Sequence, residues 1–197
     1  MNDSIARFYN RISIIYPLIN LFLLRQRVHL LEEVNSYPTG KLLEIGVGDG
    51  NHLRLYKKHQ IIGIDVSELM LKRARKSNPE KAELYCMNGE ALAFADASFD
   101  YIVLSHVLAV TIDPDKLLQE IGRVLKPGGT LFLLNHFTPE TWLSWMDKAF
   151  QPVAKLLRFR SYFLPAQLGT LAAAFTLEKI RGFGLHDYFQ LRIYSKP

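Results

Sequence analysis

The residues best suited to chemistry gather at a glycine-rich turn, Gly46-Val-Gly48-Asp-Gly50. An apolar run typical of a buried strand, residues 41–45, leads directly into it and carries Glu44 just before the turn. Glycines let a backbone turn sharply and approach a ligand closely, and open sheets bind ligands at the carboxyl ends of their strands. The turn therefore predicts a ligand site.

The nature of the ligand is indicated by Asp65, which ends a second apolar run at residues 61–65. A carboxylate has two acceptor oxygens and can take hydrogen bonds from both hydroxyls of a ribose. The GxGxG spacing lacks the third glycine of the dinucleotide fingerprint and the lysine of a phosphate-binding loop. A nucleoside without a pyrophosphate fits this pattern better than NAD or ATP does.

These residues are placed by a regular alternation of short apolar strands and amphipathic helices. Strands are predicted at residues 41–45, 61–65, 82–87, 101–105 and 130–134. Ser67 and Asp113 suit helix N-caps, and residues 126–129 suit a helix end. The pattern predicts an α/β fold: an open, mostly parallel, Rossmann-like sheet with helices on both faces.

The chain is expected to form a single domain, 1–197. An N-terminal helical extension or lid occupies 1–36, with Leu21, Leu24, Val28 and Leu31 on one seam after Pro17. The cofactor-binding core occupies 37–136. A substrate-facing or membrane-facing part, 137–197, starts with a helical stretch to about residue 157. It ends with a helix and two strands that close the sheet edge.

The motifs around these elements resemble those of the class I S-adenosylmethionine-dependent methyltransferases. The resemblance covers about residues 40–135 and includes the glycine turn, the end of the second strand, the segment 88–100 and the loop 123–129. It implies S-adenosyl-L-methionine as cofactor. The residues implied to bind it are Glu44, Gly46, Gly48, Gly50, Asp65, Val66, Asn88, Gly89, Glu90 and Ser105. Members of the family often carry Asp where this chain has Asn88, whose side-chain oxygen can still accept from the adenine amino group.

The flanks resemble one branch of that family, the bacterial phospholipid N-methyltransferases. The matching features are residues 8–11, Tyr16-Pro17, Val47 in the glycine turn and residues 133–137. This resemblance implies methyl transfer to the amine of phosphatidylethanolamine and its methylated derivatives.

An amine must lose its proton before it can attack a methyl group, so an acceptor or a desolvating site nearby is useful. The candidates are His106 and His136, after the fourth and fifth strands, and Tyr9 and Tyr16 on the N-terminal lid. The alternative for each histidine is a hydrogen-bonded structural residue, and for each tyrosine a packing residue. No histidine shows the spacing of a metal site, and no metal is expected.

Charge and hydropathy indicate contact with a membrane surface. The net charge of +5 is concentrated in residues 137–197, which hold eight basic and four acidic side chains, whereas 37–136 hold twelve of each. Two segments suit an interfacial helix, residues 12–24 and a stripe from Trp142 to Leu157 with basic neighbours Lys148, Lys155, Arg158 and Arg160. Packing in the core is the alternative for the stripe. The basic residues near it could also hold a lipid phosphate.

The expected partners are a phospholipid substrate and an anionic membrane surface, with no nucleic acid, and the chain is expected to be a monomer. A cytoplasmic, peripherally membrane-associated location follows from this and from a single cysteine, Cys86, which is expected in a buried strand. Two other functions stay open. One is methyl transfer to a small soluble or isoprenoid acceptor, and the other is a cofactor-binding protein without activity.

Overall fold

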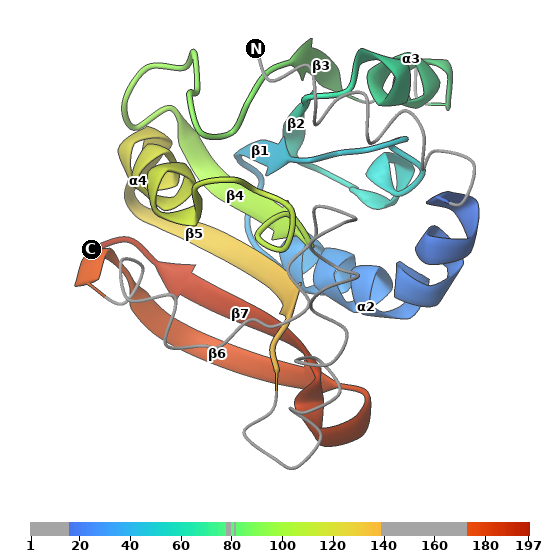
Figure 1. Ribbon diagram of the computed structural model, residues 1–197. Coiled ribbons are helices and arrows are strands. Elements are labelled where there is room, and N and C mark those ends of the chain that lie inside the picture. The colour runs from blue at the N-terminus through green and yellow to red at the C-terminus, as the bar shows by residue number, and fades with distance from the viewer. Residues whose placement is uncertain (1–15, 78–79, 81, 139–172) are drawn as a thin grey trace.

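The computed structural model describes residues 16–77, 80, 82–138 and 173–197, and of residues 16–24 and 185 it describes the backbone alone. Seven strands form one sheet in the order β3-β2-β1-β4-β5-β7-β6 (Figure 1). The strands are β1 Lys41–Ile45, β2 Gln60–Asp65, β3 Glu83–Cys86, β4 Phe99–Ser105, β5 Leu125–His136, β6 Thr176–Phe183 and β7 Phe189–Ser195. The first five are parallel, and β7 is antiparallel to β5 and β6. The prediction of a mostly parallel α/β fold is confirmed.

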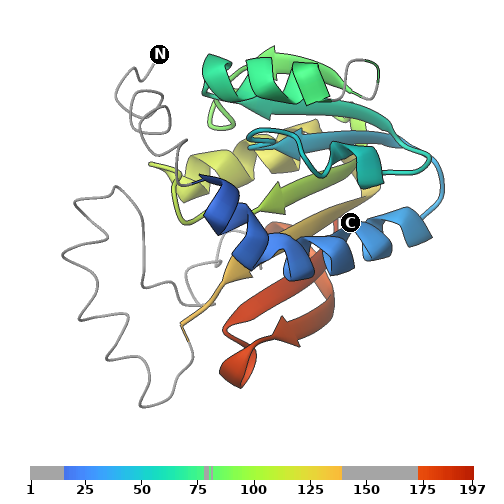
Figure 2. The ribbon, with the colours of Figure 1, turned by 90° about the vertical axis from the view of Figure 1, so that its right-hand side faces the viewer.

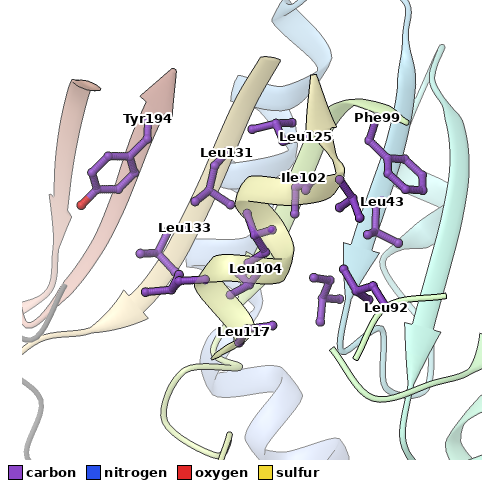
Figure 3. Packing of buried hydrophobic residues seen from close by; sticks show 14 of the residues in the cluster. Leu43, Leu92, Phe99, Ile102, Leu104, Leu117, Leu125, Leu131, Leu133 and Tyr194 are labelled. Carbon is purple, nitrogen blue, oxygen red and sulfur yellow. The ribbon is translucent and has the colours of Figure 1, made fainter. Parts of the chain in front are cut away.

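Helices cover both faces of the sheet. Helix α2, Tyr16–Ser36, packs on one face through Leu30 and Val34, together with α3, Glu68–Ser77. Helix α4, Pro114–Val124, packs on the opposite face, as Figures 1 and 2 show. Figure 3 shows the apolar core beneath α4, to which β1, β4, β5 and β7 all contribute side chains. This burial on both faces explains why the strands read as continuous apolar runs.

The helix ends lie where the sequence predicts them. The Met70 N–H donates to Ser67 Oγ over 3.3 Å, and the Lys116 N–H donates to Asp113 Oδ1 over 3.0 Å. Both side chains therefore satisfy amide groups that have no partner within the helix. These caps start α3 and α4 close to the carboxyl ends of β2 and β4, which fixes the loops that carry the site.

The structure corrects three expectations. Residues 126–129, expected as a loop before the fifth strand, are an irregular part of β5: Leu125 pairs with Phe99 and Thr130 with Tyr101, and Lys196 bonds to Gly128 and Gly129. The regular alternation of strands and helices predicts a helix between the first two strands, where the structure has a single 3₁₀ turn, Leu53–Leu55. Cys86 is exposed and not buried, because β3 is the outer strand of the sheet.

The C-terminal strands close the sheet as predicted. Strand β7 pairs along β5 from Thr130↔Ser195 to His136↔Phe189, so the beginning of β7 lies at the carboxyl end of β5. Across the part of the chain that is described, no helix has the length and apolar character needed to span a membrane.

Candidate functional site

The glycine turn has a backbone conformation that favours glycine. Gly46, Gly48 and Gly50 have φ angles of 79°, 57° and 67°, which side-chain-bearing residues rarely adopt. The N–H of Gly46 donates to the carbonyl of Ile64 over 2.8 Å, which fastens the turn to β2. A Cβ atom on Gly46 would lie 2.5 Å from Val107 Cγ2, so the turn packs directly on the segment after β4.

Asp65 lies at the end of β2, beside this turn. Its two carboxylate oxygens accept from the N–H of Gly48 over 2.9 Å and from the N–H of Ser67 over 2.8 Å. Burial raises its pKa, and these backbone hydrogen bonds oppose the rise. Each oxygen keeps a further lone pair, so the group can still accept from ribose hydroxyls. Val66 follows it, half-buried.

Glu44 is buried beneath the turn and has protein partners on both oxygens. Tyr56 Oη donates to Oε2 over 2.9 Å, and His52 Nε2 bonds to Oε1. The carboxylate thus ties the end of β1 to the segment that follows the glycines. Its contact with a cofactor stays a prediction.

Asn88 and Glu90 connect the loop after β3 to the loop before α4, at the carboxyl edge of the sheet. The Glu90 N–H donates to Asn88 Oδ1 over 3.0 Å, while Glu90 Oε1 accepts from Thr111 Oγ1 over 2.7 Å and from the N–H of Ile112 over 2.9 Å. Burial tends to raise the pKa of Glu90, but these hydrogen bonds outweigh it and the pKa is lowered. Gly89 lies between Asn88 and Glu90 in the sequence. A Cβ atom at this position would lie 2.9 Å from Ile45 Cγ2, so the loop packs closely on the end of β1. Glu90 positions the loops, and its cofactor contact also stays a prediction.

An arginine that sequence reasoning missed also lies at this edge. Arg27, on α2, donates from Nε to Ser105 Oγ over 3.4 Å at the end of β4. Its charge also acts on Tyr56 and His106. The spacing in the sequence could have revealed it. Arg27 lies three residues after Leu24 and four before Leu31, so it is on the helix face that packs on the sheet.

His106 follows Ser105 in a left-handed conformation with φ 61°. A non-glycine residue with this φ is uncommon, and the conformation costs free energy. Its Nε2 atom is buried and has no hydrogen-bond partner in the described structure, and its ring meets Phe189 edge-on at 5.7 Å. Burial, followed by the charges of Arg27 and His136, lowers its pKa to about 3. The imidazole is therefore neutral at physiological pH.

His136 is buried and is the last residue of β5, which ends two residues later than the predicted strand 130–134. Its ring stacks on Tyr188 with the centroids 5.7 Å apart. Tyr188 in turn meets Phe189, the residue that touches His106. The two histidines thus belong to one aromatic cluster at the carboxyl ends of β4 and β5, as their positions in the sequence predict.

The remaining candidates lie outside what the structure describes. Tyr9 and the stripe from Trp142 to Leu157, with its basic neighbours, are outside the described residues. Tyr16 is the first residue of α2, and only its backbone is described.

The residues present fit S-adenosyl-L-methionine. The carboxyl ends of β1, β2 and β4 are adjacent, since Ile45 pairs with both Ile64 and Leu104. The glycine turn, the Asp65 carboxylate and Asn88 therefore line one edge, with acceptors for hydroxyl and amino groups and no lysine or P-loop for a pyrophosphate. When bound there, the cofactor supplies a methyl group activated on a sulfonium.

Comparison with known proteins agrees with this assignment. Residues 43–133 match the family model described as a methyltransferase domain. The chain is 32% identical over 168 residues to a phosphatidylethanolamine N-methyltransferase of Cereibacter sphaeroides, covering 82% of each chain. It is 30% identical over 156 residues to a ubiquinone/menaquinone biosynthesis C-methyltransferase of Hydrogenovibrio crunogenus, covering 74% of this chain and 58% of that one.

A solved structure shares the fold over nearly the whole chain. It is a methyltransferase of Thermotoga maritima, described as S-adenosylmethionine-dependent and as a possible histamine N-methyltransferase. The TM-score is 0.76 at 23% identity, covering 98% of this chain and 100% of that one. From the glycine turn, the acidic end of β2 and these relatives together, the chain belongs to the class I S-adenosylmethionine-dependent methyltransferases.

Proposed function

We propose that this methyltransferase transfers methyl groups to the amine of phosphatidylethanolamine and its methylated derivatives at a membrane surface. The observation that carries the proposal is the 32% identity to a phosphatidylethanolamine N-methyltransferase, which extends over 82% of both chains. This match extends beyond the shared cofactor-binding region into the flanks, where acceptor specificity is expected to reside.

The chemistry at the site supports an amine acceptor. In the reaction, the amine nitrogen forms a bond to the methyl carbon as the carbon–sulfur bond breaks, and the departing proton goes to water. The protein must therefore keep the amine unprotonated and aligned. A site that lowers the pKa of His106 by burial and by the nearby Arg27 charge lowers the pKa of a bound ammonium in the same way.

His106 is suited to orienting the acceptor and not to storing its proton. With a pKa of about 3, the imidazole is a weak base, but its buried Nε2 is available for a hydrogen bond to a ligand. His136 and Tyr188 extend the same surface as a stacked pair. Aromatic faces of this kind also attract an ammonium that carries methyl groups.

A competition between acceptors tests the proposal. The enzyme is given S-adenosyl-L-methionine with vesicles that contain equal amounts of phosphatidylethanolamine and a demethylated isoprenoid quinone. We expect the phospholipid to be methylated on nitrogen and the quinone to remain unchanged. Methylation of the quinone alone would refute the phospholipid assignment and leave the family assignment standing.

The quinone is a second candidate acceptor because of the 30% identity to the quinone C-methyltransferase. That match covers only 58% of the relative's length, compared with 82% for the phosphatidylethanolamine N-methyltransferase. Carbon methylation requires a carbon nucleophile in the acceptor. The competition experiment described above would detect it as a quinone that carries a methyl group on its ring.

The role of His136 is tested by His136→Ala. We expect turnover to fall about tenfold or more while cofactor affinity changes little, because His136 lies in the aromatic cluster and not beside Asp65. Steady-state kinetics and calorimetry separate the two effects. Turnover equal to that of the unchanged enzyme would return His136 to a structural role.

A further inference from the structure

Strand β7 carries a buried arginine that the reaction described above does not use. Arg192 is 9% exposed and pairs with Leu133 of β5. It lies on the α4 face of the sheet, because Tyr194, two residues on, belongs to the core beneath α4 (Figure 3). Its neighbours Leu191 and Ile193 face the other way, toward α2.

The partners of Arg192 are neutral. Its Nε donates to Gln190 Oε1 over 2.9 Å, and its guanidinium carbon lies 4.4 Å from the centroid of the Phe137 ring. A guanidinium has five N–H donors, so the four on the two Nη atoms have no protein acceptor among the described residues. The side chain is thus positioned by a ring and an amide while most of its donors stay available.

No carboxylate in the described ranges forms an ion pair with Arg192. Other basic side chains in the fold have one: Arg123 bonds to Glu120 and Asp96, and Lys126 bonds to Asp100. A buried cation without an anion is costly, because it loses its hydration and gains no opposite charge. Within the described residues, the surroundings of Arg192 therefore lack an anion.

The guanidinium is directed toward the edge where the cofactor site lies. Gln190 pairs with Asn135, and Phe137 follows the end of β5, so both contacts lie nearer to the carboxyl edge than Leu133 does. Asn135 is also fully buried on this face, with an Oδ1 atom that has no partner in the described structure. Next to His136, this edge of the sheet thus holds the Nη donors of Arg192 and the acceptor Asn135 Oδ1, none of which has a partner among the described residues.

We infer that Arg192 binds the phosphate group of the acceptor, through the two N–H pairs of its Nη atoms. A phosphodiester offers two oxygens with the spacing of this fork, which makes the contact charge-assisted and directional. The inference deepens the proposed function and rests on it for the identity of the phosphate as a lipid head group. Free inorganic phosphate has the same chemistry, and the experiment distinguishes the two sources.

Calorimetry with three soluble probes, in the presence of S-adenosylhomocysteine, tests the contact without turnover. The probes are glycerophosphoethanolamine, inorganic phosphate and the phosphate-free amine 2-(2-hydroxyethoxy)ethylamine. We expect glycerophosphoethanolamine to bind at least about tenfold more tightly than either other probe. Tightest binding of inorganic phosphate would overturn the head-group assignment.

Two variants assign the binding to this residue. Arg192→Gln is expected to weaken glycerophosphoethanolamine about tenfold or more and to leave the phosphate-free amine unchanged, whereas Arg192→Lys retains part of the affinity. Arg181→Gln is the matched control, because Arg181 also lies over a phenylalanine ring, that of Phe183 at 5.3 Å, but is exposed on β6. Equal affinity of Arg192→Gln and the unchanged protein would refute the inference.

Thermal unfolding distinguishes a phosphate contact from a structural role. Glycerophosphoethanolamine should raise the unfolding temperature of the unchanged protein and of Arg181→Gln, but not that of Arg192→Gln. With vesicles, Arg192→Gln should raise KM for phosphatidylethanolamine more than it lowers kcat. If the enzyme methylates no ethanolamine lipid, the proposed function fails while the binding experiments still decide the phosphate contact.

Discussion

At the scale of single residues, the site depends on side chains whose burial changes their chemistry. Asp65 has a raised pKa and His106 a pKa lowered to about 3, both chiefly through burial. We expect the Asp65 carboxylate to accept hydrogen bonds from the cofactor's nucleoside, and the neutral His106 imidazole to lie near the methyl acceptor. Their types and positions at strand ends were visible in the sequence, but their protonation follows only from the packing around them.

Asp65→Ala should weaken S-adenosylmethionine binding about ten- to a hundredfold, because it removes a charged acceptor for two hydroxyls. Asp65→Asn keeps the shape and one acceptor oxygen, so a smaller loss is expected. Calorimetry with the cofactor measures both. Unchanged affinity in Asp65→Ala would contradict the ribose contact.

The lowered pKa of His106 gives a pH dependence of stability with a definite sign. Below its ordinary pKa of 6.5, the unfolded chain binds a proton at this residue and the folded protein does not. Stability therefore falls as the pH drops from about 6.5, by on the order of 1 kcal/mol per pH unit, and is unaffected above it. Urea unfolding at pH 7, 6 and 5 measures this, and His106→Gln should show the shallower slope. Parallel slopes in the two proteins would be evidence against the buried neutral imidazole.

At the scale of elements, the sequence predicts the five parallel strands and the two capped helices with good accuracy, since each depends on local patterns. Apolar runs mark the strands, and Ser67 and Asp113 mark the helix starts. Cys86 was placed wrongly because a single strand does not reveal whether it lies inside the sheet or at its edge. Arg27 and Arg192 were missed because their importance depends on contacts with strands far away in the chain.

Alanine substitutions at two glycines, Gly50 in the cofactor turn and Gly128 in β5, distinguish the cost of backbone strain from that of steric crowding. Gly50 and Gly128 both have positive φ angles, of 67° and 73°, but only at Gly50 would a Cβ meet a neighbour, Ala74 Cβ at 2.7 Å. Gly128→Ala should cost about 1–2 kcal/mol through strain alone, and Gly50→Ala about 1–3 kcal/mol more. Denaturant unfolding measures both. Equal costs would show that the turn does not pack on α3 as described.

At the scale of the whole molecule, the fold separates two tasks. The neutral segment 37–136 carries the cofactor-binding edge, and the excess positive charge follows it in 137–197. The C-terminal hairpin β6–β7 belongs to this second part and brings Arg192 beside the end of β5. We propose that the C-terminal part, through its excess of basic residues, contacts an acidic lipid surface beside the family-wide cofactor site.

Binding to vesicles tests that charge distribution. The full chain should sediment with vesicles that contain anionic lipid, less with neutral ones, and binding to the anionic vesicles should decrease as salt screens the attraction. Equal sedimentation with both kinds of vesicle, independent of salt, would contradict an electrostatic contact.

The central claim, nitrogen methylation of an ethanolamine phospholipid, is tested most directly by following the methyl group itself. The enzyme is incubated with S-adenosylmethionine labelled with deuterium in the methyl group and with phosphatidylethanolamine vesicles, and the lipid head groups are analysed by mass spectrometry. We expect the intact labelled methyl on the ethanolamine nitrogen, and about ten- to a hundredfold slower labelling with Asp65→Ala at limiting cofactor. Absence of labelled head group from the unchanged enzyme, under conditions in which it binds the cofactor, would contradict it.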